Sequence, residues 1–407
     1  MIDTMLSTDR PSEDGQANLV YEVYDRRSTR QNQSSSHAGR APHAHGDRRP
    51  KPPKKSRLSG SVPRTPPPPH PCQRRMDSKI SRKIARPRQP QRPPGRTSST
   101  PPRAAQSRDS GRGTPNRIVG AHQSIAGGLS RAVDRAVETG CHCLQIFTRN
   151  INRWDVSPLD TVDAEAFKQA VSAAGLALVV AHDSYLINPA AANADLRKKS
   201  IAGLVTEIER ASLLDIPWVV AHPGAAGEQP RDQAVQRAAE GIATALSRTR
   251  GLTAGILIET TAGQGSCLGD SFEEIAAMLE TIDAAGHAAR VAVCLDTCHV
   301  FAAGYRLSPK RELDRTLAAF DTTIGLERLK VIHANDSKRE RGSRVDRHES
   351  IGRGKIGPDA FRLIMNHPKL ANIPLILETP KEGPDGKPCP EQDRGNLATL
   401  RGFMGPS

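Results

Sequence analysis

Nine histidine, aspartate and glutamate side chains stand at positions of the sequence where they could bind metal ions. Six of them directly follow short apolar runs such as LALVVA, WVVA and GILI, namely His182, His222, Glu259, Asp296, His333 and Glu378. His299 follows three residues after Asp296 in DTCH, and Asp346 and His348 lie in the polar segment GSRVDRHES. Imidazole and carboxylate groups together form a ligand set that suits Zn²⁺ or a similar ion.

Each of these residues also has an ordinary structural explanation. A single histidine at a strand end is more often a hydrogen-bonded core residue than a ligand, and polar residues in a charged loop are often solvated. The joint pattern favours metal binding, because carboxylates that point into one pocket repel one another unless cations hold them. Nine ligands exceed the needs of one four-coordinate ion, so they predict two or three ions, which would suit phosphodiester hydrolysis.

The segments around these residues alternate between two patterns. Short apolar runs predict eight β-strands, at residues 118–124, 143–148, 176–182, 218–224, 255–260, 291–297, 329–335 and 374–379. Helical periodicity follows each of them, at residues 127–138, 164–174, 194–214, 231–249, 271–282, 309–324, 358–366 and 391–403. This alternation predicts an α/β protein with a (β/α)8 TIM barrel, whose strand ends and following loops carry the chemistry. A doubly wound open sheet is the alternative, but no glycine-rich dinucleotide turn follows the first strand.

Residues 1–115 differ in composition from the rest of the chain. They hold 18 of the 32 prolines, and residues 1–116 hold 24 of the 58 Lys and Arg but only 9 of the 44 Asp and Glu. Such a sequence cannot bury enough apolar area to offset its conformational entropy, so we expect a long disordered basic Pro/Arg-rich tail before a barrel domain at residues 116–407. The tail would attract nucleic acid, or carry a nuclear-import-like cluster at residues 48–57. A solvated tail without function, or upstream sequence translated from a wrongly assigned start codon, is the alternative.

The cysteines and the apolar runs limit the class of protein. Seven cysteines, an odd number without framework spacing, argue against a disulfide-stapled secreted protein. Cys294 and Cys298 alternate with Asp296 and are expected to pack within a strand. No apolar run approaches the length of about 20 residues that spans a bilayer, so no membrane partner is expected. The acidic residues near the amino terminus are unlike a signal or transit peptide.

Eight short segments carry a more specific similarity. In chain order they are GAHQSIAGGL, HDSYLIN, HPG, IETTAGQGSCLG, CLDTCHVFAAGY, HANDS, GSRVDRHESIGRG and IPLILET. Together they run through most of the predicted barrel, and none lies in the tail. On these segments the sequence resembles the endonuclease IV family of abasic-site DNA repair enzymes, AP endonuclease family 2.

This resemblance implies a trinuclear zinc site built from the nine residues. The first zinc would be held by His182, His222 and Glu259, with Glu259 bridging to the second. The second would add Asp296, His333 and Glu378, and the third would be held by His299, Asp346 and His348. Glu259 and Glu378 are the implied catalytic carboxylates, and Mn²⁺ in part of the site is an alternative to Zn²⁺.

The implied reaction is hydrolysis of the phosphodiester 5′ to an abasic site, leaving a 3′-hydroxyl, together with the cleaning of blocked 3′ ends. The ions would activate the attacking water and stabilise the leaving oxygen, without Mg²⁺ or a nucleotide cofactor. The implied partner is double-stranded DNA with abasic sites or blocked 3′ ends, bound by a monomer. We expect a cytoplasmic, nucleoid-associated protein if the source is bacterial and a nuclear one if it is eukaryotic.

Loop side chains are implied to fill the gap left by a flipped abasic nucleotide. Tyr185 in HDSYL matches one such wedge residue, and its ring could stack on a base. A half-buried packing residue is the alternative. The other wedge position departs from the family, which has an arginine two residues before the tryptophan. FTRNINRW has Asn152 there, so either Arg153 takes over the contact or the wedge is weaker.

Two other functions compete with this one. Xylose-isomerase-like sugar isomerases and epimerases also place His, Asp and Glu at strand ends, but they need about four ligands for one ion and have no use for His299, Asp346 and His348. The second is a non-catalytic DNA-binding protein whose tail does the binding. Loss of a bridging carboxylate would have supported it, but Glu259 and Glu378 are both present.

The charge distribution predicts that the tail takes part in DNA binding. Deleting residues 1–115 is expected to weaken binding to undamaged duplex at low salt. The plot of log affinity against log salt should become shallower, because fewer counterions are released. Incision under saturating conditions should barely change, since every proposed ligand lies beyond residue 118. Binding titrations at several salt concentrations check this, and an unchanged slope would show that the tail does not contact DNA.

Overall fold

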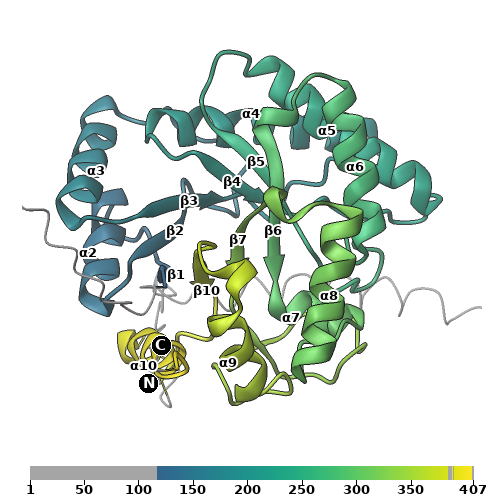
Figure 1. Ribbon diagram of the computed structural model, residues 1–407. Coiled ribbons are helices and arrows are strands. Elements are labelled where there is room, and N and C mark those ends of the chain that lie inside the picture. Colours follow the sequence, from purple (N-terminus) through teal and green to yellow (C-terminus); the bar gives the residue numbers. More distant parts are fainter. Residues whose placement is uncertain (1–116, 384–386, 388, 406–407) are drawn as a thin grey trace, which may run out of the picture. The chain divides into compact units, whose positions relative to one another are not determined.

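The computed structural model describes residues 117–383, 387 and 389–405. Its eight-stranded parallel sheet closes into a barrel in the order β1-β10-β7-β6-β5-β4-β3-β2 (Figure 1). The strands are β1 (Val119–His122), β2 (Cys143–Phe147), β3 (Leu178–His182), β4 (Trp218–Ala221), β5 (Gly255–Glu259), β6 (Val291–Asp296), β7 (Leu329–His333) and β10 (Leu375–Leu377). The predicted TIM barrel is therefore confirmed. The prediction of a disordered tail falls on residues outside the described part of the chain.

The predicted helices follow the strands and ring the barrel (Figure 1). They are α2 (Leu129–Thr139), α3 (Thr161–Ala174), α4 (Ala194–Leu213), α5 (Arg231–Arg248), α6 (Phe272–Ala284), α8 (Lys310–Thr323), α9 (Pro358–Asn366) and α10 (Pro390–Gly402). Short 3-10 turns precede β6, β7 and β10, namely η2 (Ala288–Arg290), η3 (Leu326–Arg328) and η4 (Pro368–Leu370). Asp160, Asn193 and Ser271 begin α3, α4 and α6 by accepting a hydrogen bond from a backbone N–H of the first turn.

Two local elements were not predicted. Helix α7 (Thr297–Ala303) begins where the predicted strand 291–297 was expected to continue, because Asp296 Oδ1 accepts a hydrogen bond from the backbone N–H of His299 at 2.8 Å. The loop after β7 contains an antiparallel ribbon, β8 (Asp336–Ser337) with β9 (His348–Glu349). The Asp336 carboxylate closes this loop by accepting hydrogen bonds from the backbone N–H groups of Gly354 and Ile356.

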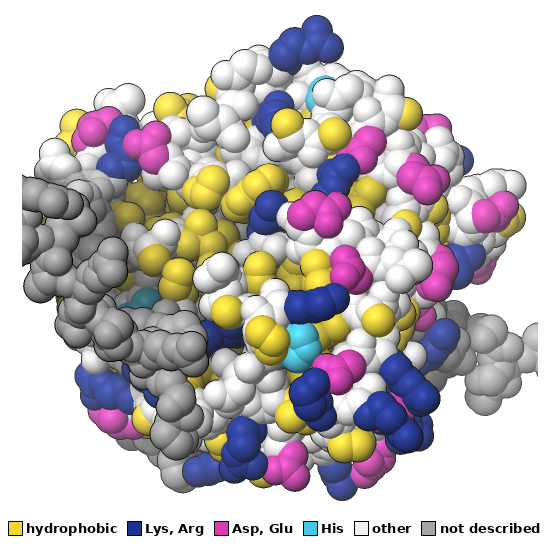
Figure 2. Space-filling model, in the orientation of Figure 1, with side chains coloured by type: hydrophobic (Ala, Val, Ile, Leu, Met, Phe, Trp, Pro, Cys, Tyr) yellow, Lys and Arg dark blue, Asp and Glu magenta, His cyan; other side chains and the backbone are white. Residues whose placement is uncertain are grey.

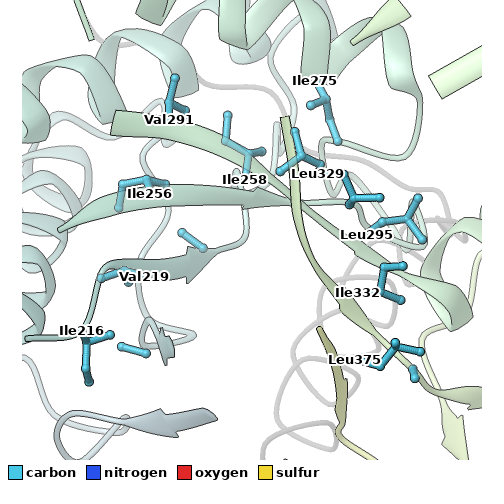
Figure 3. Close-up of a cluster of buried hydrophobic side chains, with 14 of the residues drawn as sticks. Ile216, Val219, Ile256, Ile258, Ile275, Val291, Leu295, Leu329, Ile332 and Leu375 are labelled. Atoms are coloured by element: carbon cyan, nitrogen blue, oxygen red, sulfur yellow. The ribbon is translucent and has the colours of Figure 1, made fainter. Parts of the chain in front are cut away.

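Alternation along the strands separates two apolar layers. The outer layer packs against the helices and includes Val219, Ile256 and Ile258 (Figure 3). The inner layer fills the barrel and consists of Cys143, Val180, Val220, Leu257, Ala292, Cys294, Val331 and Ile376. Because strand side chains alternate, the residue two positions after an inner one points inward again. On β3 to β7 and β10 that residue is a predicted ligand, which brings six ligands to one mouth of the barrel.

The surface of the barrel domain mixes both signs of charge. Figure 2 shows Lys and Arg side chains interspersed with Asp and Glu on one face. Several form ion pairs within one helix, such as Lys310 with Asp314 and Arg362 with Asp359. None of the described helices is long and apolar enough to cross a membrane.

A buried ion pair attaches the loop between β2 and α3 to helix α4. Arg149 Nε lies 2.6 Å from Glu207 Oε1, and the two side chains are 3% and 1% exposed. The Thr148 hydroxyl donates to Glu207 Oε2 at 2.7 Å, and Arg149 also donates to the carbonyl of Arg153 at 2.6 Å. Arg210, on the same helix, donates to the Thr148 carbonyl at 2.5 Å. Helix α4 therefore holds in place the loop that carries Asn152 and Arg153.

This arrangement predicts a large stability cost when Glu207 loses its charge. Glu207→Gln leaves the buried Arg149 guanidinium without its counter-charge, so we expect the free energy of unfolding to fall by about 3 kcal/mol. Glu209→Gln makes the same chemical change at an exposed position of α4 and should cost less than about 0.5 kcal/mol. Urea unfolding of both variants checks this, and equal losses would contradict the assigned role of the pair.

Candidate metal centre

Glu259 lies at the centre of the barrel mouth, fully buried at the end of β5. Its Oε2 atom lies 3.2 Å from His182 Nε2 and 3.1 Å from His222 Nε2. Its Oε1 atom lies 3.0 Å from His333 Nδ1. His299 Nδ1 lies 3.3 Å from the same Oε1 atom. One carboxylate thus faces two imidazoles on each side, an arrangement that suits a bridging ligand.

His182, His222 and Glu259 form a first group, whose ligand atoms lie within 4.8 Å of one another. A second group of ligand atoms shares Glu259 with it. One ligand atom from each of Glu259, Asp296, His333 and Glu378 lies within 4.8 Å of the others. His333 Nδ1 lies 3.2 Å from Glu378 Oε2 and 3.9 Å from Asp296 Oδ2. Since Asp296 caps α7 with Oδ1, its Oδ2 atom remains directed at this group, and Asn335 donates to it at 2.6 Å.

A third group comes from α7 and the loop after β7. Asp346 Oδ2 lies 3.2 Å from His299 Nε2, and Asp346 Oδ1 lies 3.2 Å from His348 Nε2. Ligand atoms of His299 and His348 also lie within 4.8 Å of one on Asp296. The structure therefore brings all nine predicted ligands together, with Glu259 joining the first and second groups and Asp296 adjoining the second and third.

Cys298 corrects one expectation from the sequence. It was expected to pack within a strand, but it lies in α7, because the Asp296 cap turns the chain into a helix. Its ligand atom lies within 4.8 Å of those of Asp346 and His348. Burial raises the pKa of the Cys298 thiol, so the thiol form is favoured at neutral pH. Cys294, in contrast, packs inside the barrel as expected.

Backbone carbonyls orient three of the imidazoles. His182 Nδ1 lies 2.9 Å from the carbonyl oxygen of Asp183, His299 Nδ1 lies 2.7 Å from that of Thr260, and His348 Nδ1 lies 3.1 Å from that of Glu378. A carbonyl oxygen only accepts, so each Nδ1 carries a hydrogen. The Nε2 atoms are then the ones that face the groups, as metal-ligating histidines commonly arrange.

Charge balance within the buried site shifts several pKa values. Burial by itself raises the pKa of Glu259, but the charges of His333 and His222 outweigh burial and hold that pKa well below its usual value. Burial lowers the pKa of His348, but Asp346 and Asp296 outweigh it and raise the pKa to about 9. Positive charge beside Glu259 thus keeps it ionised, whereas burial outweighs the neighbouring imidazoles at Asp296 and raises its pKa. Divalent ions supply the positive charge that such buried carboxylates need.

The geometry and the donor set fit metal ions. Ligand atoms held about 2.1 Å from one tetrahedral zinc lie about 3.4 Å from one another. The nitrogen–oxygen separations here run from 3.0 Å for His333 and Glu259 to 3.9 Å for His333 and Asp296. His299 Nε2 and Asp346 Oδ1 are buried, and neither makes a well-directed hydrogen bond among the described residues, although each lies 3.2 Å from an oppositely charged group. Buried polar atoms normally have an interaction partner, and a bound cation would serve as that partner here.

The three predicted DNA-contact residues lie at different places. The Tyr185 ring is half-buried beside the first group, with its centroid 5.7 Å from that of His182 and 6.3 Å from that of His222. Asn152 and Arg153 are exposed in the loop after β2. Tyr185 therefore adjoins the proposed metal site, whereas the other two residues lie in a separate loop.

Sequence reasoning missed two residues of the site, His122 and Gln145. His122 ends β1 as the six predicted ligands end their strands, and its Nδ1 atom lies 3.8 Å from Glu378 Oε1. Burial, the largest effect, lowers the pKa of His122 to about 3, so this ring is neutral near pH 7. The amide of Gln145 contacts His122, His333 and Glu378. The strand-end position of His122 was the available signal.

Comparison with known proteins agrees with this fold. Residues 133–401 match the family model of the xylose isomerase-like TIM barrels. A D-tagatose 3-epimerase-like protein of known structure, 17% identical, shares the fold with a TM-score of 0.53, and the match covers 70% of this chain and 97% of that chain. At that identity the likeness concerns the fold alone.

Relatives of higher sequence identity are named endonuclease 4 or endonuclease IV. Probable endonuclease 4 of Chloroflexus aggregans is 45% identical over 285 residues, which cover 70% of this chain and 97% of the relative. The corresponding protein of Geobacter sulfurreducens is 44% identical over 288 residues, which cover 70% of this chain and 94% of the relative. The crystal structure of endonuclease IV from Thermus thermophilus is 37% identical with a TM-score of 0.61, covering 70% of this chain and 98% of that chain. The chain belongs to the endonuclease IV family.

Proposed function

We propose that this enzyme is a zinc-dependent DNA repair endonuclease. It hydrolyses the phosphodiester 5′ to an abasic site, leaves a 3′-hydroxyl, and also cleans blocked 3′ ends. The observation that carries the proposal is the convergence of nine His, Asp and Glu side chains on three adjoining groups around Glu259. Membership of the endonuclease IV family supports the choice of DNA as the substrate.

Each group would hold one ion. The first consists of His182, His222 and Glu259, the second of Glu259, Asp296, His333 and Glu378, and the third of His299, Asp346 and His348. Bound divalent ions supply Lewis-acid activation of water and neutralise the charge that develops on the phosphate. Imidazole and carboxylate ligands suit Zn²⁺, with Mn²⁺ as the alternative for part of the site.

The chain's own residues position the reaction. Glu259 and Glu378 would hold the catalytic ions, and the complete burial of Glu259 keeps bulk water from its carboxylate. Tyr185 lies beside His182 and His222, where its ring can stack in the gap left by a displaced nucleotide. Asn152 and Arg153 contact the DNA from the loop that the Arg149–Glu207 pair fixes.

The main rival is a sugar isomerase or epimerase on the same fold. Such sites need about four protein ligands for a single ion, whereas the third group here adds His299, Asp346 and His348 beside the second. A non-catalytic DNA-binding protein would have no need for Glu259 buried between four imidazoles. Both alternatives therefore leave part of the observed geometry without a role.

The partner and the location follow from this function. We propose that the enzyme acts as a monomer on double-stranded DNA with abasic sites or blocked 3′ ends. The most similar relatives described above come from bacteria, where DNA lies in the cytoplasm. The location proposed is therefore the cytoplasm.

Incision of a duplex with one abasic site tests the function. The native protein should cut the strand 5′ to the lesion and leave a 3′-hydroxyl that a DNA polymerase extends. Glu259→Gln keeps the volume but removes the anionic bridge, so incision should fall roughly 100-fold or more, while duplex binding weakens far less.

Glu273→Gln is the matched control, because Glu273 is exposed in the first turn of α6 and is not one of the proposed ligands. This control should incise like the native chain. Near-normal incision by Glu259→Gln would exclude its bridging role. A native protein that loads zinc but leaves the abasic strand intact would contradict the proposed function itself.

A further inference from the structure

Gln145 lies fully buried in β2, inside the barrel mouth, and its amide reaches three side chains from other strands. Its Oε1 atom lies 2.8 Å from His333 Nε2. Its Nε2 atom lies 2.5 Å from Glu378 Oε1 and 3.0 Å from His122 Nδ1. One uncharged side chain therefore contacts two proposed ligands of the second ion.

The direction of these hydrogen bonds follows from the carboxylate. Ionised Glu378 only accepts, so the amide N–H of Gln145 must face it, and the second amide hydrogen donates to His122 Nδ1. The amide oxygen then faces His333 Nε2, which must carry the hydrogen. Both amide hydrogens and the amide oxygen have partners in this arrangement.

His333 is consequently oriented the opposite way from the carbonyl-bonded histidines. Those three donate Nδ1–H to a backbone carbonyl and direct Nε2 at their groups. His333 donates Nε2–H to Gln145 and directs Nδ1 at Glu259 Oε1 and Glu378 Oε2, at 3.0 and 3.2 Å. No backbone carbonyl does this for His333 in the contacts of the described residues. Side chains surround the ring instead: the Cys294 thiol lies beside it, and the Gln145 amide oxygen lies 2.8 Å from Nε2 and is its orienting partner at that nitrogen.

We propose that Gln145 is a positioning residue of the metal centre, which sets His333 to bind the second ion through Nδ1 and holds Glu378 beside it. This inference rests on the proposed function, because it presumes that the second group binds zinc. Gln145 contacts neither the ion nor the DNA in this role. It acts through the orientation of two ligands from β7 and from the end of β10.

Two substitutions test separately the contact of Gln145 with His333 and its contact with Glu378. Gln145→Met keeps the length of the side chain but removes all three hydrogen bonds of the amide. Gln145→Glu keeps an acceptor for His333 Nε2–H but places a carboxylate against Glu378. The matched control is Gln123→Met, since Gln123 is also buried and donates to a carboxylate, Asp393 Oδ2 at 2.8 Å, but contacts none of the proposed ligands.

The first readout is zinc affinity, measured by competition with a chromophoric chelator. In Gln145→Met, one of the three zinc ions should bind about 10- to 100-fold more weakly, the usual cost of losing such a supporting contact. The other two ions should bind as in the native chain, and Gln123→Met should retain all three. On an abasic duplex, Gln145→Met should lower kcat and leave KM unchanged, because the contacts to DNA are intact.

The second readout is the nitrogen spectrum of ¹⁵N-histidine in the zinc-loaded protein. The native chain should show one histidine bound through Nδ1 with Nε2 protonated. This signal should persist in Gln145→Glu and be lost in Gln145→Met. Native zinc affinity together with a retained His333 signal in Gln145→Met would overturn the proposal. A native chain that binds no zinc would instead overturn the proposed function, so the two failures are distinguishable.

Discussion

The balance of charge around four carboxylates, two fully buried and two partly buried, is the constraint on which the rest of this structure depends. Glu259, Asp296, Asp346 and Glu378 converge on the mouth of a closed barrel, where burial penalises each ionised group. Five imidazoles each have a ring nitrogen 3.0–3.2 Å from a carboxylate oxygen in their closest pairs. Protonated imidazoles can balance the charge, but divalent ions balance it while leaving the ring nitrogens free to coordinate.

The barrel meets this constraint through strand geometry. Each ligand-bearing strand places an apolar residue inside the barrel and a ligand two positions later, as with Val180 and His182 or Leu257 and Glu259. The inner apolar layer therefore forms the floor of the site. The third group cannot come from strands in this way, so α7 and the loop closed by Asp336 bring His299, Asp346 and His348 to the same place.

Much of this arrangement could be predicted because alternation is a local property. The six strand-end ligands follow apolar runs, and a period of two fixes the side of the strand on which they lie. The positions of Asp346 and His348 could not be derived in this way, since loop conformation depends on contacts such as the carboxylate of Asp336 with distant amides. Their residue types and their polar loop after the seventh predicted strand made them candidate ligands, and the family resemblance alone assigned them to a third ion.

Helix α7 and the role of Gln145 were not predicted from the sequence, and both omissions have physical causes. In DTCH, Asp296 was interpreted as a ligand alone, although a carboxylate before an apolar segment is also a helix cap, and this second role starts α7. Gln145 stands between apolar neighbours in CLQIF, where alternation places it inside the barrel. Its partners His333 and Glu378 lie 188 and 233 residues away in sequence, so no local pattern could reveal the contacts.

The central claim is that the nine side chains hold three ions in adjoining groups. Anomalous diffraction at the zinc absorption edge, from crystals of the native protein grown with zinc, tests it most directly. The account predicts three peaks, one within each group, with Glu259 between the first two and Asp346 at the third. A single peak, or peaks in the strand-end groups with none beside His299, Asp346 and His348, would contradict it.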